Sequence, residues 1–294
     1  MCTKKRLNGV SCTKEAHEYI ATMTEPTFRS IDHIVLRVAD AKHVFRLLTE
    51  HLGLPITWAL EEAEFATFGW ASVGNTNLEI WASSNNDDIP AEVELPLVHG
   101  FALEPEDLWH SLALLARRGV RCKPPRAYQT KNADGELRTN FTNSVVLDVS
   151  SDSCCIFFCE WGAEAPITPW QKGLTATQRR AQELRGLQDC AGGLLGILGL
   201  SEVRMAVPDI STALQKWQAL TASDRNPVPL TPDINLRLEE GEFQEIVELT
   251  FAVQNLEAAR AALHRIGLPA VSTPRGLLIS PEATGGLRLQ IAQA

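Results

Sequence analysis

The pattern of hydrophobic and polar positions repeats along the chain as a short apolar strand that runs directly into an amphipathic helix. The clearest copy is residues 30–40, a run rich in β-branched residues that closes on Asp40, a good N-cap for a helix over 41–52. Alternation gives the strand one purely aliphatic face, made of Ile34, Leu36 and Val38, which suits packing under that helix. The other face carries His33 and Arg37, which core packing does not require. We therefore take these two residues as functional candidates.

The same strand-to-helix pattern returns three more times. The later copies are 97–103 with helix 106–118, 201–209 with helix 210–220, and 248–253 with helix 256–266. Shorter strand-like runs follow each helix, as at 56–59, 65–73 and 77–82 in the first copy. The repetition predicts an α+β protein built from four copies of one supersecondary unit, paired two and two.

Changes in composition divide the chain into two domains and two connecting segments. The predicted organisation is an N-terminal arm at 1–28, expected to be disordered, a first domain at 29–163 with modules 29–84 and 96–162, a linker with a helix at 164–197, and a second domain at 198–294. This length is enough for two domains with hydrophobic cores of their own.

Charge and cysteine content narrow the possible partners. A net charge of −9 argues against nucleic acid and anionic membranes, and no apolar run approaches the roughly 20 residues that span a bilayer. Seven cysteines without a Cys-x-x-Cys spacing are typical of reduced thiols. The basic residues 4–6 are not followed by the apolar segment of a secretory signal. We expect a cytoplasmic monomer or homodimer that acts on a small molecule.

Four stretches, at 32–40, 77–81, 98–103 and 157–161, resemble the vicinal oxygen chelate superfamily, which includes glyoxalases, bleomycin-resistance proteins and extradiol dioxygenases. The resemblance implies four βαβββ modules that pair into two half-barrel domains, with metal ligands on the first and last strand of each module. Carried over to this chain, the ligands are His33, Glu79, His99 and Glu160. The second domain has Glu202, Glu248 and Gln290 near the corresponding positions and no histidine there, so it reads as degenerate.

Spacing alone leads to the same four residues. Two histidines lie in the first strands of two repeats and two glutamates in the last strands, where a carboxylate among apolar neighbours needs a partner or a cation. Nitrogen and oxygen donors without thiolate fit one divalent Fe, Mn, Ni, Zn or Co ion. No organic cofactor is predicted. Taken singly, such a histidine is more often a satisfied strand residue, and such a glutamate a solvated strand end.

These residues favour a metal-dependent lyase or isomerase in which the metal holds two adjacent substrate oxygens. Glu160 or Glu79 would carry a proton, while Arg37, Phe101, Phe158 and Trp81 would contact the substrate. Arg37 paired with a neighbouring acid is an equally good interpretation.

Two alternatives stay open from the sequence. One is an Fe(II) extradiol-type dioxygenase that uses His33, His99 and Glu160 as a facial triad, although the dioxygenases that this chain resembles carry iron in their C-terminal half. The other is a non-catalytic ligand-binding protein of the resistance type.

Overall fold

The computed structural model describes residues 25–85, 90, 93–168 and 170–294. Its strands form one curved, 15-stranded sheet with few helices, which confirms the α+β prediction. Most of the expected arm, residues 1–28, lies outside the described residues. Its described end, 25–28, packs on the protein, where the Thr27 hydroxyl donates to the Leu220 carbonyl oxygen at 2.8 Å.

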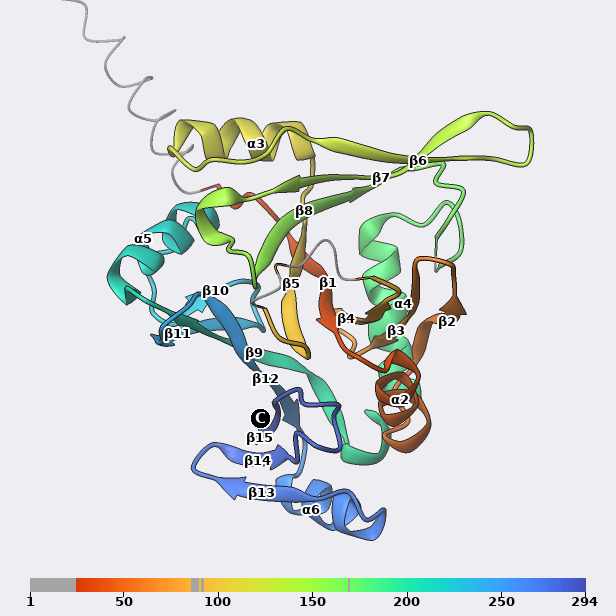
Figure 1. The fold of residues 1–294 in the computed structure, drawn as a ribbon, viewed down its shortest axis with the longest axis vertical. Helices are drawn as coiled ribbons and strands as arrows, with labels where there is room; N and C mark the ends of the chain where they lie inside the picture. Colours follow the sequence, from red (N-terminus) through yellow and green to blue (C-terminus); the bar gives the residue numbers. More distant parts are fainter. Residues whose placement is uncertain (1–24, 86–89, 91–92, 169) are drawn as a thin grey trace, which may run out of the picture.

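The first half of the chain forms two modules side by side (Figure 1). The first module consists of β1 (Ser30–Arg37), α2 (Ala41–Arg46) with a π-helical turn (Leu47–His51), β2 (Ile56–Glu62), β3 (Ala66–Ser72) and β4 (Asn77–Ser83). The second consists of β5 (Leu97–Glu104), α3 (Leu108–Arg117), β6 (Arg126–Lys131), β7 (Leu137–Val145) and β8 (Cys155–Trp161). The strand order is β2-β3-β4-β1-β5-β8-β7-β6, with β1 and β5 antiparallel at the centre.

The second half repeats this plan with one shortened module. After helix α4 (Ala176–Asp189), the third module has β9 (Ile197–Val207), α5 (Ile210–Thr221), the two-residue β10 (Val228–Pro229) and β11 (Asn235–Glu240). The fourth has β12 (Glu245–Val253), α6 (Leu256–Arg265), β13 (Ala270–Thr273), β14 (Gly276–Ile279) and β15 (Leu289–Gln293). The third module therefore has one strand fewer than the βαβββ pattern predicts.

Helix caps align the four modules with one another. α2, α3, α5 and α6 each follow an Asp or Asn whose side chain accepts a backbone N–H of the first turn. These caps are Asp40, Asp107, Asp209 and Asn255. The cap at Asp107 also explains why α3 begins at Leu108 and not at the predicted 106.

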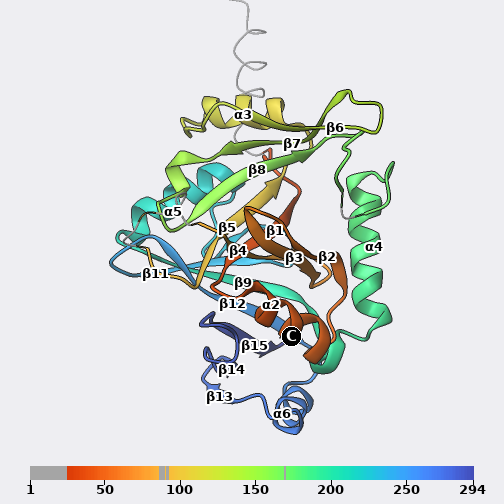
Figure 2. The same ribbon diagram turned by 45° about the vertical axis from the view of Figure 1, so that its right-hand side comes forward.

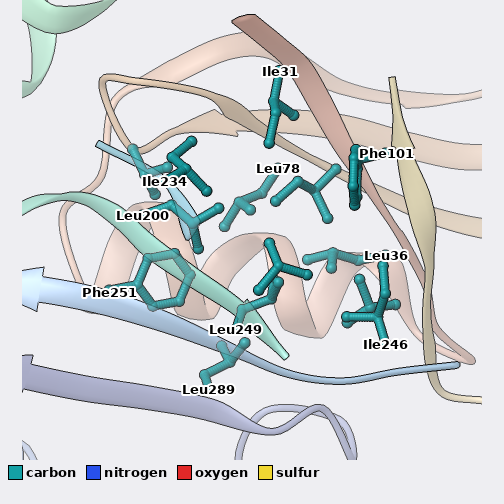
Figure 3. Packing of buried hydrophobic residues seen from close by; sticks show 14 of the residues in the cluster. Ile31, Leu36, Leu78, Phe101, Leu200, Ile234, Ile246, Leu249, Phe251 and Leu289 are labelled. Atoms are coloured by element: carbon teal, nitrogen blue, oxygen red, sulfur yellow. The ribbon is translucent and has the colours of Figure 1, made fainter. Parts of the chain in front are cut away.

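Both halves contribute to one hydrophobic core (Figure 3). The aliphatic face predicted for the first strand is confirmed, since Ile34, Leu36 and Val38 are all buried. At the junction, Ile246 of β12 pairs with Val98 of β5, so the two half-barrels share a continuous sheet. Burial of this shared apolar surface is the main force that holds the halves together.

Helix α4 runs along the outer edge of the first half-barrel, beside β2 and β3 (Figure 2). It is the segment that the sequence assigns to the linker. None of the helices in the described ranges has the length and apolar character that a membrane crossing requires.

Candidate functional site

The concave face of the first half-barrel encloses a cavity of about 440 Å³, a size typical of small-molecule sites. Both modules line it, with strands β1 to β4 on one side and β6 to β8 on the other. Nine of the lining residues are aromatic: Trp58, Phe65, Phe68, Trp70, Trp81, Tyr128, Phe141, Phe157 and Trp161. The others are His33, Glu61, Ala63, Glu79, Asn140, Asn143, Cys159 and Ile167.

Strand alternation decides which residues reach this cavity. In β4, Glu79 and Trp81 are two positions apart and line it together. In β8 the lining residues are Phe157, Cys159 and Trp161. The alternate residues of β8 therefore face the other side of the sheet.

His33 is a buried polar group of the site that neighbouring side chains hold in place. It is 5% exposed, and its ring lies 4.6 Å from that of Trp70, measured between centroids. Its Nδ1 is 2.7 Å from a carboxylate oxygen of Asp32. Its Nε2 is 3.4 Å from Oε2 of Glu79. The imidazole therefore lies between two acids, one behind it and one at the cavity.

Asp32 is fully buried and is held by cations from α4. Arg179 approaches one of its oxygens at 2.7 Å and Arg180 at 3.2 Å, and the Trp161 indole N–H donates to the other at 3.2 Å. Burial alone would raise the pKa of Asp32, but Arg179, His33 and Arg180 outweigh it and hold that pKa well below its ordinary value. Because an ionised carboxylate only accepts hydrogen bonds, Nδ1 of His33 must donate to it.

The structure does not bring Glu160 to His33. Oε1 of Glu160 accepts the backbone N–H of Leu108 at 2.8 Å, which places the carboxylate at the N-terminus of α3. The N-terminus of a helix has unpaired N–H groups and a partial positive charge. It therefore provides the hydrogen bond and the favourable charge that a carboxylate among apolar strand residues needs. The predicted role of Glu160 as a metal ligand and proton carrier therefore has no support from its position in this structure.

His99 is also not among the cavity residues, because the repeats align one position differently. Seven residues before each cap stand His33 in the first module and Gly100 in the second. A Cβ at Gly100, whose φ is +143°, would lie 1.8 Å from the carbonyl oxygen of Cys155, so this position cannot carry a side chain. His99 lies in a bulge of β5, where Val35 pairs with Gly100 and the next pair involves Val98.

Of the four predicted substrate contacts, one lines the cavity and three do not. Trp81 lines the cavity. Phe101 and Phe158 are fully buried, and Phe101 stacks on Trp217 of α5 with 5.9 Å between centroids. Arg37 is 4% exposed and is not one of the lining residues. Phe101 and Phe158 lie in the core instead of the cavity lining, because the apolar face of the sheet packs there.

These donors do not fit a chelated metal ion. Such ions take three or four protein ligands, whereas only His33 and Glu79 of the predicted four meet at the cavity. Among the described residues, no three His, Cys, Asp or Glu side chains are placed to hold a metal. The nearby Cys159 does not supply a thiolate, since burial raises its pKa well above the ordinary value. We therefore derive no step through a metal.

The sequence interpretation missed Asp32 and most of the aromatic lining. Four of the seven tryptophans lie at this cavity, namely Trp58, Trp70, Trp81 and Trp161. Their positions on alternating sites of short strands are a signal that the sequence does contain. It is ambiguous, however, because aromatic residues are common in strands of any kind.

Comparison with known proteins agrees with this fold. Residues 30–134 match the model of the Glyoxalase/Bleomycin resistance protein/Dioxygenase superfamily. No curated protein matches the chain. Among solved structures, a hypothetical protein from Staphylococcus aureus is 11% identical with a TM-score of 0.56, covering 90% of this chain and 99% of its own. Homoprotocatechuate 2,3-dioxygenase from Arthrobacter globiformis is 15% identical with a TM-score of 0.53, and the match covers 92% of this chain and 80% of the dioxygenase. The 2,3-dioxygenase LapB from Pseudomonas sp. KL28 is 11% identical with a TM-score of 0.53, and the match covers 92% of this chain and 93% of LapB. At these identities the likeness shows the fold alone.

Proposed function

Because residues 30–134 match the glyoxalase/bleomycin resistance protein/dioxygenase superfamily model, we propose that the first half-barrel binds a small, flat molecule without a chelated metal. The observation that carries this proposal is the cavity of about 440 Å³, whose lining contains nine aromatic residues and the close pair of His33 and Glu79. Of the sequence hypotheses, it favours the ligand-binding protein.

The physical basis of binding is the aromatic surface. Tryptophan and phenylalanine rings provide a large apolar area at a low entropic cost, and they stack on flat ligands. The rings already contact one another, as in the Trp58–Trp70 pair at 5.8 Å and the Phe141–Trp161 pair at 5.3 Å between centroids. The walls are therefore preformed, which reduces the ordering cost of binding.

A fluorescence titration tests the proposal, with 1-naphthol as the probe. We expect saturable quenching of tryptophan emission, binding that is unchanged by EDTA, and a loss of binding of about tenfold or more in Trp81→Ala. The control is Trp109→Ala, because Trp109 is 68% exposed on α3 and is not a cavity residue. Equal affinity in both variants, or no binding to the parent protein, contradicts the proposal.

The second candidate is the metal-dependent enzyme, either a lyase or isomerase or a dioxygenase. What favours it is the 3.4 Å approach of His33 Nε2 to Glu79 Oε2 at the cavity, together with neighbours that are named 2,3-dioxygenases. It requires one Fe, Mn, Ni, Zn or Co per purified chain, lost in His33→Ala and in Glu79→Gln. Elemental analysis of the three proteins decides between the candidates.

A further inference from the structure

We propose that the ligand of this cavity is an organic cation, that is, a flat aromatic molecule with a positively charged nitrogen. The inference rests on the proposed function, that this cavity binds a small molecule, and adds the chemical class. Three features of the cavity walls support it: their charge, the arrangement of their rings, and their unpartnered N–H groups.

The wall charge is negative. Glu61 and Glu79 line the cavity, and no lysine or arginine lines it in the part of the chain that the structure describes. The nearest cations from α4, Arg179 and Arg180, already pair with Asp32 behind the wall. Glu79 has a side chain only 15% exposed, so part of its hydration is lost. A carboxylate in this situation gains from a cation brought in by the ligand.

His33 does not fill that role in its neutral form. Its Nδ1 proton goes to Asp32, so a neutral ring directs only a lone pair toward Glu79. The 3.4 Å contact is also long for a charge-assisted hydrogen bond.

Several aromatic rings line the cavity together with Glu79. Trp81 and Phe68 stack at 5.2 Å between centroids, and Phe65 continues this stack on Phe68 at 6.0 Å. Trp70 lies opposite Glu79 on the neighbouring strand β3 and also lines the cavity. Aromatic faces attract cations most strongly where water is partly excluded, and tryptophan is the most effective of them.

Unpartnered donors give an independent sign of a ligand. Trp70 is 3% exposed and lines the cavity, yet within the part of the chain that the structure describes its indole N–H has no partner, and the buried N–H of Trp81 has none either. Buried N–H groups are normally paired, so these two call for an acceptor atom from a ligand or water. The cation that fits best therefore also carries a carbonyl or ether oxygen.

Three probes of similar size and different charge test the proposal. They are N-methylquinolinium, which is a cation, 1-methylnaphthalene, which is neutral, and 1-naphthoate, which is an anion. In fluorescence titrations of the full chain we expect the cation to bind about tenfold tighter than the neutral probe, and the anion more weakly than either. Glu79→Gln should abolish most of this preference while the neutral probe still binds, which also shows that the variant is folded.

The matched control is Glu136→Gln, since Glu136 is exposed in the β6–β7 hairpin and changes the net charge by the same amount. It should keep the full preference for the cation. Glu61→Gln, at the edge of the cavity, should reduce it in part. Equal binding of cation and neutral probe, or a preference unchanged in both cavity variants, overturns this inference and leaves the proposed function intact. Failure of all three probes to bind overturns both.

Discussion

Replacing Asp32 by Asn removes the charge at the centre of the network that joins α4 to the first half-barrel. Arg179 and Arg180 both lie within 3.2 Å of this carboxylate, and His33 depends on it for orientation. The amide keeps the shape of the side chain but leaves two guanidinium groups short of negative charge inside the protein. Breaking a buried pair by removing one partner typically costs about 3–5 kcal/mol of the free energy of unfolding.

Urea unfolding of the parent and variant proteins measures this loss. In the double variant Asp32→Asn with Arg179→Met, the two losses should not add, because Arg179 no longer needs the missing charge. The imidazole of His33 gives a second readout, since ¹⁵N spectra should show that the Nδ1–H tautomer is no longer fixed in Asp32→Asn.

The control is Asp134→Asn, the same substitution at an exposed position in the β6–β7 turn, where the change should stay within about 0.5 kcal/mol. If Asp32→Asn loses no more stability than this control, the network does not hold α4 as argued. Strict additivity in the double variant would refute the pairing with Arg179 specifically.

Three further predictions follow from burial, backbone geometry and core packing. The pKa of Glu248 lies below its ordinary 4.5, because the arginines around this carboxylate outweigh the effect of its burial. The ionised carboxylate therefore stabilises the fold at neutral pH, and this stabilisation is lost as the pH falls below 4.5. Glu248→Gln should flatten the acid side of a plot of urea midpoint against pH. Gly100→Ala should cost about 3 kcal/mol, because its Cβ would meet the Cys155 carbonyl, whereas Gly119→Ala, with open space around it, should cost about 1 kcal/mol by the same assay. Phe101→Ala should lose about 3–5 kcal/mol in urea unfolding and leave 1-naphthol affinity unchanged, since this ring lies in the core; weaker probe binding would return it to the site.

Local signals were sufficient to predict most of the fold. An apolar strand that ends in Asp and continues as a helix is a strong pattern. β4 at Asn77–Ser83 ends one residue beyond the predicted 77–82. The shortened third module was not predicted, because β11 at Asn235–Glu240 has two leucines and three charged residues, which is a short and weak strand signal. Its parallel pairing with β9, a contact distant in sequence, stabilises it.

The site was harder to predict because both faces of its strands are apolar. In β8, one alternating set contains Phe158 and Glu160 and the other contains Phe157 and Trp161, and patterning alone does not say which set faces the cavity. A one-residue offset had a similar effect in β5, where His99 stands beside the true counterpart of His33. Helix caps would have fixed that register, since they lie at the same distance from equivalent strand positions in every module.

The second half-barrel shows what else these aligned positions can hold. Seven residues before its caps stand Glu202 and Glu248. Glu202 pairs with Arg237 at 2.8 Å, while the fully buried Glu248 is held by Arg275 at 2.6 Å and Arg288 at 3.3 Å. Guanidinium groups thus neutralise these acids from within the protein, whereas the ion-pair partner of Glu79 among the described residues of the first half is His33. Since a partly buried carboxylate gains from a cation, Glu79 is the acid to which a ligand can supply one.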